Sequence, residues 1–517
     1  MLIRSISLLL LSILSSGFLF SQVRFSSSFE SGSMGEVRRI DSTWTKISAK
    51  DSILTLSYDL SSRFDPLNPV DTSLKPSARW YYFRIDGVKG KQIFLNIQNS
   101  EAIRPFYSYD GINFRRFEEG ENLNRRQVNK IFTHDTVFIS HFIPYTYSRL
   151  SNKIDQWRKC EYVDYREIGK SHLGVSIPML TITDRSVPDQ NKKRIWIHGR
   201  AHPSEQPCSW HLEAMINELT SGSEYSKSLL SHSIFYIVPM INPDGVTGGY
   251  SRSTSTGVNV EINWDREDSL TTPEIKVLKA ILTELTTNRP FDLFLNMHSQ
   301  IANSATYWIH TAESTSPVTY RNQLLLSNLT VNNNPFYTSK DQSFSDMAPR
   351  YPEGWMWNRF GDKTVAITFE TPYTYYKENI DGDWVSVENL SRMGMNSLFA
   401  ISDYLDISTP DRLLVNPEIT NKRRWEQSLN NADVFFGDEF YKAKSKKAKV
   451  KIAIPEMKKG VYKVFSWSVG PADKISPEGT NCWKEITTVD HKRDGKFRWK
   501  MNAEGIGGIA DKILLAK

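Results

Sequence analysis

Residues 194–205 read RIWIHGRAHPSE, and this stretch decides the fold class of the middle of the chain. Its first part, 194–198, has the nearly unbroken apolar character of a buried strand. A helix is predicted from Pro207 to about Leu219, so the polar residues between them lie in a loop that joins a strand to a helix. Active sites of α/β sheets lie in such loops, at the carboxyl ends of strands.

The alternation of strands and helices continues along the chain. It predicts further strands at 234–240, 292–297 and 364–369, and further helices at 274–285 and 387–405. Strands that alternate with helices are typical of an α/β domain, here a mixed twisted sheet flanked by helices. We predict that this catalytic domain spans residues 164–409.

Two β-rich regions flank this domain. Residues 22–163 hold short period-two runs, such as 80–85 and 92–97, between Gly, Asn, Asp and Pro turns, which favours an N-terminal β-sandwich. Residues 410–517 form a basic linker followed by short strands, and so predict a small C-terminal β domain. The lysines of the linker are spaced like the polar face of one strand, and a solvated edge is favoured over binding to an anionic surface: Lys442, Lys444, Lys446, Lys447, Lys449 and Lys451.

The first 21 residues have the pattern of a signal peptide. Arg4 provides a positive charge, 6–20 is an apolar run too short to span a bilayer, and the small residue Ser21 follows as a cleavage site. We therefore expect a secreted or periplasmic protein without a membrane span. A net charge of +6 is small for 517 residues, and together with the lack of any zinc-finger, RNP or P-loop pattern it argues against nucleic acid as a partner.

The chain has three cysteines, Cys160, Cys208 and Cys482. Because the number is odd and small, we predict no disulfide framework and at most one pair. Cys208 follows shortly after the polar loop, and a small core residue is favoured there over an additional metal ligand.

The polar loop contains His202 and Glu205, an imidazole and a carboxylate three residues apart that can converge on one cation, with Pro203 stiffening the turn between them. His298 stands at the end of another predicted strand. Two histidines and one carboxylate with an open fourth position form a catalytic zinc set.

Two further residues are candidates for the reaction itself. Glu370 ends the predicted strand 364–369, where a carboxylate can take a proton from the attacking water and pass it to the leaving group. Arg252, in a loop rich in Ser and Thr, can stabilise an oxyanion. Taken alone, Glu370 is as readily a surface residue at a strand end, and Arg252 is more readily an ordinary exposed arginine than a catalytic one.

These motifs together resemble the zinc carboxypeptidases of the carboxypeptidase A superfamily, closest to the branch with the cytosolic carboxypeptidases and their bacterial relatives. His202-Pro203-Ser204-Glu205 looks like the HPGE motif of that branch, and 239–246 (PMINPDGV) looks like its PMLNPDGV motif. Segments 29–32, 80–84 and 144–148 look like parts of the β domain that precedes the catalytic domain in that branch. The resemblance covers about 29–405 and implies one zinc ion per chain, held by His202, Glu205 and His298, with Glu370 as the catalytic glutamate and Arg252 as the oxyanion arginine.

One segment departs from the family pattern, which reads Gly-Val-Asp-Leu-Asn-Arg-x-Trp and whose Asn-Arg pair grips the terminal carboxylate of the substrate. Here 257–264 reads GVNVEINW, so that Glu261 and Ile262 replace that pair in the expected substrate-binding pocket. Recognition of a free carboxylate is therefore in doubt. Asn259 stands where the family often has Asp and either orients a zinc histidine or is an ordinary loop residue.

We therefore expect a zinc metallohydrolase that cleaves an amide bond of a peptide or peptide-like substrate, with cell-wall peptide as one possibility. Two alternatives stay open. One is a zinc amidase or deacylase whose substrates lack a free C-terminal carboxylate, and the other is a non-catalytic protein that binds peptides or glycans.

Overall fold

The structure is a computed structural model that describes residues 22–99, 101, 104–124, 126–332, 334, 336–338, 341–376, 384–429, 436, 439–469, 481–506 and 509–517. The predicted signal peptide, 1–21, lies outside the described residues. Contacts divide the chain into two compact units. Among the described residues, the first unit comprises those of 22–67, 72–146 and 245–252, and the second comprises those of 68–71, 147–244 and 253–517.

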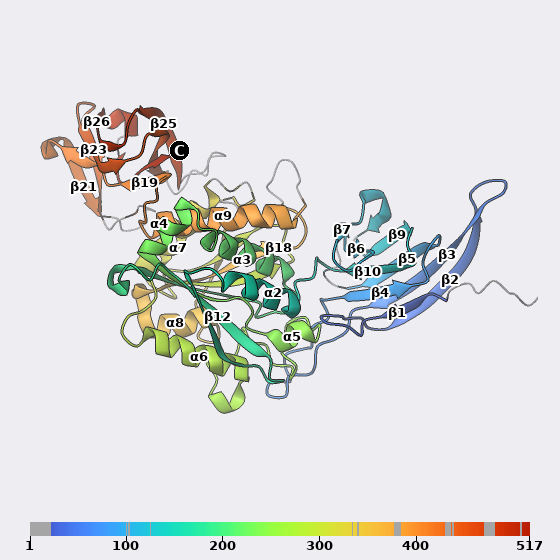
Figure 1. Cartoon of the computed structure of the whole chain (residues 1–517). Helices are drawn as coiled ribbons and strands as arrows, with labels where there is room; N and C mark the ends of the chain where they lie inside the picture. The colour runs from blue at the N-terminus through green and yellow to red at the C-terminus, as the bar shows by residue number, and fades with distance from the viewer. Residues whose placement is uncertain are drawn as a thin grey trace, which may run out of the picture. The chain divides into compact units, whose positions relative to one another are not determined.

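The first unit contains two five-stranded sheets (Figure 1). One has the order β1-β4-β10-β6-β7: β1 (Arg24–Ser26), β4 (Tyr82–Asp86), β10 (Thr136–Ser140), β6 (Phe106–Ser108) and β7 (Arg115–Arg116). The other has the order β2-β3-β5-β9-β8: β2 (Val37–Lys46), β3 (Ser52–Ser61), β5 (Gln92–Gln98), β9 (Gln127–Ile131) and β8 (Asn122–Asn124). Alternate residues of both sheets, such as Phe83 and Leu95, are fully buried in one shared apolar core. The period-two runs of the sequence therefore form strands that bury one face.

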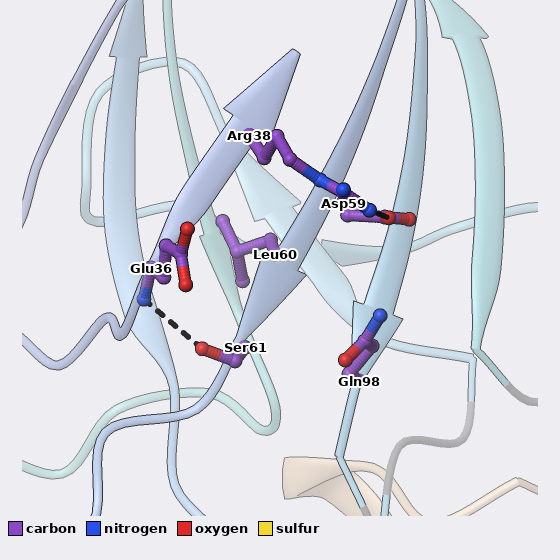
Figure 2. Close-up of a pocket in the computed structure, with 6 residues that line it drawn as sticks. All are labelled: Glu36, Arg38, Asp59, Leu60, Ser61 and Gln98. Carbon is purple, nitrogen blue, oxygen red and sulfur yellow. Dashed lines mark hydrogen bonds and ion pairs between the residues drawn. The ribbon is translucent and has the colours of Figure 1, made fainter. Parts of the chain in front are cut away.

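A polar hollow of about 180 Å³ lies on the second of these sheets, lined by Glu36, Arg38, Asp59, Leu60, Ser61 and Gln98 (Figure 2). Two of its charged groups are paired, since Arg38 Nη2 donates to Asp59 Oδ2 at 2.7 Å. The backbone N–H of Glu36 donates to Ser61 Oγ at 3.0 Å. The lining has no histidine or cysteine. All six lining residues belong to the first unit, whereas His202, Glu205 and His298 belong to the second.

The second unit is built on an eight-stranded mixed sheet of order β11-β12-β14-β13-β15-β18-β16-β17. The strands are β11 (Val163–Lys170), β12 (Ser176–Ile182), β14 (Ser233–Val238), β13 (Lys193–Gly199), β15 (Leu293–Gln300), β18 (Val365–Pro372), β16 (Thr306–His310) and β17 (Ser343–Ser345). The central strands β14, β13, β15 and β18 run parallel, and antiparallel strands join them on both sides. Central parallel strands are buried on both faces, which explains their nearly continuous apolar sequences.

Helices cover both faces of this sheet (Figure 1). Helices α3 (Gln206–Leu219), α7 (Pro317–Val331) and α9 (Val387–Tyr404) lie together over one face. Helices α6 (Pro273–Thr286) and α8 (Pro352–Phe360) lie over the other, where Trp196, Phe294 and Ala366 of the sheet pack with Leu278 and Trp355. Three further α-helices complete the set in the described residues: α2 (Tyr147–Trp157), α4 (Glu224–His232) and α5 (Pro243–Thr247).

The predicted α/β layer is confirmed at the level of a mixed sheet flanked by helices. The predicted strands and helices of this layer overlap β13, β14, β15, β18, α3, α6 and α9, with differences of a few residues at their ends. Helix α2 lies inside the segment predicted as β-sandwich, 22–163, and the sequence analysis did not find α7 or α8 either. The apolar residues of α7 do not gather on one side of the helix, because both sides are buried, so no helical periodicity marked it.

In the described residues, the C-terminal part of the second unit consists of β-strands and two short 3₁₀ helices, Lys422–Arg424 and Ala503–Ile506. One sheet has the order β19-β28-β24-β25: β19 (Arg412–Val415), β28 (Ile513–Ala516), β24 (Gly460–Val469) and β25 (Asn481–His491). The others are β20 (Glu418–Thr420), β23 (Lys449–Met457) and β26 (Gly495–Asn502), and β21 (Trp425–Leu429), β22 (Glu439–Ala443) and β27 (Ile509–Ala510). Trp467 and Trp483 pack against Leu325 and Leu329 of α7 in one apolar cluster.

The lysines of 442–451 do not share one strand face, and that prediction was wrong. Lys442 lies on β22, Lys449 and Lys451 lie on β23, and Lys444 to Lys447 lie in the turn between these strands. A turn rich in Lys and Ser has the same alternating polarity as an edge strand. The spacing of the lysines therefore did not distinguish a turn from a strand. In the part of the chain that the structure describes, we find no helix with the length and apolar character that a membrane crossing requires.

Candidate active site

The candidate site lies at the carboxyl ends of three adjacent parallel strands, β13, β15 and β18. Gly199 at the end of β13 pairs with Met297 of β15, and the next residue of β15, His298, pairs with Glu370 of β18. Paired residues of neighbouring strands direct their side chains to the same face of a sheet. His298 and Glu370 are therefore presented side by side, next to the loop that leaves β13.

That loop makes a sharp turn that places His202 and Glu205. Arg200 has φ of 62°, a left-handed conformation, and its buried guanidinium donates to the carbonyl of Pro203 and to Ser209 Oγ, at 2.7 and 3.0 Å. Glu205 is the N-cap of α3, but its side chain does not cap the helix. The carboxylate is instead available to the two histidines.

Glu205 bridges the two histidines. Its Oε1 lies 2.8 Å from His202 Nδ1, and its Oε2 lies 2.7 Å from His298 Nδ1. The backbone N–H of Ser299 also donates to Oε2 at 2.9 Å, which fixes the orientation of the carboxylate. All three side chains are buried, with 2% of each residue exposed.

Two further acceptors lie against the other ring nitrogens of the histidines. Asn259 Oδ1 accepts the backbone N–H of Glu261 at 2.8 Å and lies 3.2 Å from His202 Nε2. Glu261 Oε2 lies 3.0 Å from His298 Nε2. Each ring therefore has an oxygen acceptor at both nitrogens, because a carbonyl or carboxylate oxygen only accepts. With a cation between Glu205 and the two Nδ1 atoms, the hydrogen of each neutral imidazole would stand on Nε2.

These donors fit a zinc ion. The ligand atoms of His202, Glu205 and His298 lie within 4.8 Å of one another, which one cation can bridge. Two imidazole nitrogens and one carboxylate oxygen are a zinc ligand set, and three protein donors leave a fourth position open. A second group of this kind is not found among the residues that the structure describes.

Charge couples these residues strongly. Burial opposes a charge on Glu205, but His202 and His298 outweigh that effect and hold the pKa of this carboxyl well below its usual range. Burial likewise opposes protonation of His298, yet the carboxylates of Glu261 and Glu205 raise its pKa well above the usual value. The Glu205 carboxylate is thus held in its ionised form where a cation would be bound.

Residues 155–387 match the model of the zinc carboxypeptidase family. The chain carries a zinc carboxypeptidase domain. All the candidate metal ligands and both candidate reaction residues fall within the matched range, and the domain is that of a hydrolase whose cofactor is zinc.

Relatives of known name agree with this family. Human cytosolic carboxypeptidase 6 is 23% identical over 447 residues, which are 78% of this chain and 84% of that protein. Cytosolic carboxypeptidase 2 of Xenopus tropicalis is 27% identical over 54% of this chain but only 30% of its own length. A solved metallo-carboxypeptidase from Pseudomonas aeruginosa shares the fold, with a TM-score of 0.61 and 19% identity over 74% of this chain and 99% of that chain.

Behind the metal ligands of the carboxypeptidase domain lies a buried polar network that the sequence analysis missed. Asn296 Nδ2 donates to Glu261 at 3.0 Å and to Glu353 Oε1 at 2.9 Å, and Thr368 also donates to Glu353. Burial, together with the charge of Glu261, raises the pKa of Glu353. Glu353 lies in α8, far from the ligands in sequence, and no motif marks it.

His198, at the end of β13, is a second buried histidine near the network. Trp196 Nε1 donates to His198 Nδ1 at 2.8 Å, so the other ring nitrogen carries the hydrogen. Burial, with a contribution from His298, lowers the pKa of His198 to about 3. His198 is therefore neutral and adds no positive charge beside the metal site.

The structure places the other predicted site residues as follows. Glu370 is half-buried beside His298, as its strand register requires.

Arg252 belongs to the first unit, where its backbone N–H donates to Asp65 Oδ2 at 2.8 Å, and its role in catalysis stays a prediction. Cys208 is buried and its thiol donates to the carbonyl of Glu205 at 3.0 Å, while burial raises its pKa to about 11, as suits a core thiol.

Glu261 differs most from the prediction. Its carboxylate was expected to stand in the substrate pocket, but it is 7% exposed and is held by His298 and Asn296. Ile262, the next residue, is half-buried. Neither of the two nearby arginines is free to replace the missing carboxylate grip, because Arg200 is buried in its own loop and Arg266 pairs with Asp71 at 2.8 Å.

Proposed function

We propose that this chain is an exported metallocarboxypeptidase-like hydrolase that cleaves an amide bond of a peptide or peptide-like substrate. The observation that carries the proposal is the convergence of His202, Glu205 and His298 beside Glu370, at the carboxyl edge of the parallel strands. The match to the zinc carboxypeptidase family supports the same reaction class.

The three ligands would hold zinc, which when bound supplies a Lewis acid that polarises a carbonyl and activates water. Glu370 accepts the proton of the attacking water and delivers it to the leaving amine. A half-buried carboxylate suits both steps, because it exchanges protons with a bound substrate while bulk water is partly excluded. Arg252 stabilises the oxyanion that develops on the attacked carbonyl, a role that rests on the family motif.

The substrate end is the second part of the proposal. At position 262 a hydrocarbon side chain stands where the family pattern has a guanidinium, and Arg200 and Arg266 are each engaged elsewhere. A charge-assisted fork to a carboxylate contributes roughly 1.5–3 kcal/mol. Its loss favours substrates that place a neutral group at this end, so an amidase or deacylase activity is the second candidate function.

The proposed export of the protein rests on the sequence of residues 1–21 alone. The basic start, the short apolar run and the small residue at its end support export to the periplasm or the medium. The relatives named above are cytosolic by name, so a fractionation is needed. The chain should appear in the exported fraction with an N-terminus near Gln22. An uncleaved chain retained in the cytoplasm would overturn this part of the proposal.

The activity itself is tested with purified, zinc-loaded protein and three matched sets of substrates: peptides with free C-termini, the same peptides amidated, and cell-wall peptide fragments. Mass spectrometry identifies the bond that is cleaved. Hydrolysis in any set that stops on chelation and returns with zinc supports the proposal. Binding to these substrates without any hydrolysis would instead favour the non-catalytic alternative.

A further inference from the structure

The segment 257–264 contacts both histidines of the metal site on the side away from Glu205. Asn259 accepts from His202 Nε2 at 3.2 Å, and two residues further Glu261 accepts from His298 Nε2 at 3.0 Å. The two acceptors are also linked, because Asn259 Oδ1 accepts the backbone N–H of Glu261. One short loop therefore places an oxygen acceptor against the Nε2 atom of both imidazoles.

The two acceptors are not equivalent. Glu261 carries a carboxylate, whereas Asn259 offers the oxygen of a neutral amide. A hydrogen bond to an ionised acceptor is about twice as strong as one between neutral groups. It makes the ring a more basic ligand and holds it more firmly in orientation. His298 is thus supported more strongly than His202.

Glu261 is itself held in place. Asn296 Nδ2 lies 3.0 Å from Glu261 Oε1 and 3.2 Å from Oε2, and donates to Glu353 as well. Because the carboxylate is buried and held on two sides, its orientation is set before any metal arrives. A side chain placed to face a substrate would instead be exposed to the pocket.

We propose that Glu261 is a positioning residue of the metal centre. Its carboxylate fixes the Nε2–H tautomer of His298 and so raises the affinity of the site for zinc. The inference rests on the proposed metal site and deepens it. It also explains why a glutamate stands in the segment where a substrate-binding residue was expected. Asn259 has the corresponding, weaker role for His202.

The test measures zinc affinity by competition with a chromophoric chelator, without any substrate. Glu261→Gln keeps the shape and the contact to Asn296 but removes the charge, and the affinity should fall about tenfold to a hundredfold. Glu261→Asp keeps the charge but withdraws it from His298 by one methylene, and should also weaken binding. Glu267→Gln, an exposed glutamate six residues further on, is the matched control and should leave the affinity unchanged.

A rescue variant separates positioning from mere folding. Asn259→Asp combined with Glu261→Gln moves the carboxylate from His298 to His202. The zinc affinity of this double variant should be at least about threefold higher than that of Glu261→Gln alone. Thermal unfolding in chelator verifies that each metal-free variant is folded. Affinities of both Glu261 variants within threefold of wild type would overturn the proposal while leaving the hydrolase function standing. Absence of zinc binding by the wild type would overturn the metal site itself.

Discussion

His298 and Glu370 are register partners on the parallel strands β15 and β18. The pairing places the imidazole of a candidate metal ligand and a half-buried carboxylate on the same face of the sheet, although 71 residues of sequence lie between them. Thr371 reinforces the register, since its hydroxyl donates to the carbonyl of His298 at 3.2 Å and lies 2.8 Å from Ser299 Oγ. The sheet thus sets the distance between the metal site and the proton acceptor.

Glu370→Gln should abolish turnover without loss of metal. The amide keeps the size of the side chain but cannot accept the proton of the attacking water, so the rate should fall by at least about a hundredfold. Steady-state kinetics and zinc analysis of the same preparation measure both quantities. Glu388→Gln, in the first turn of α9 and exposed, is the control. A Glu370→Gln variant with the wild-type rate would contradict the mechanism.

His202→Ala should lose most of the zinc. The purified wild type is expected to hold about one zinc per chain, because the three donors form one open site. Removal of one of three ligands leaves too few donors to compete with chelators or water. Atomic absorption after dialysis measures the metal, with His232→Ala, an exposed histidine at the end of α4, as the control. Stoichiometric zinc in the His202 variant would show that the ligand assignment is wrong.

Ile262→Arg should increase activity on peptides with a free C-terminus relative to their amides. The new guanidinium restores a donor fork for a carboxylate, which contributes roughly 1.5–3 kcal/mol, or about tenfold to a hundredfold in kcat/KM. The wild type is expected to show no strong preference for the free acid. If it already prefers the acid by about a hundredfold, another residue supplies the grip and Ile262 is not the relevant position.

Asp511→Asn should stabilise the C-terminal β region at high pH more than at low pH. Burial raises the pKa of Asp511 to about 6, against smaller opposing effects of the Phe436 N–H and Lys512. Between pH 4 and 6 the folded state therefore binds more protons than the unfolded state, and stability falls as the pH rises through this window. Two pKa units correspond to about 3 kcal/mol at most.

The asparagine removes the charge but retains an acceptor for the backbone of Phe436, which now donates to Asp511 Oδ2 at 3.1 Å. The Tm of the variant should exceed that of the wild type by several degrees at pH 8 and by little at pH 4. Asp490→Asn, an exposed aspartate of β25, should shift the Tm little at either pH. An equal shift for Asp511→Asn at both pH values would exclude titration of this group as the cause.

Much of the catalytic layer could be predicted because local patterns determine it. The apolar runs at β13, β15 and β18 are long enough to require burial on both faces, and the polar residues that follow them could only lie at the carboxyl edge of the sheet. His202, Glu205 and His298 were found in this way, and the structure brings them together. Helix α7 was not found, since its burial on several sides removes the periodicity that marks a helix.

The sequence by itself determined the alternation of strands and helices, the three candidate metal donors and the substitution of a hydrocarbon at position 262. Only the tertiary structure decided what Glu261 contacts. The side chain of a loop residue can face a substrate or turn toward the protein interior. The neighbouring residues in the sequence do not determine which of these orientations it takes. Two residues of strand β15, His298 and Asn296, form the contacts that hold the Glu261 carboxylate inward. Such contacts exist only once distant segments have packed, because a buried carboxylate is stable only where donors from elsewhere in the fold meet it.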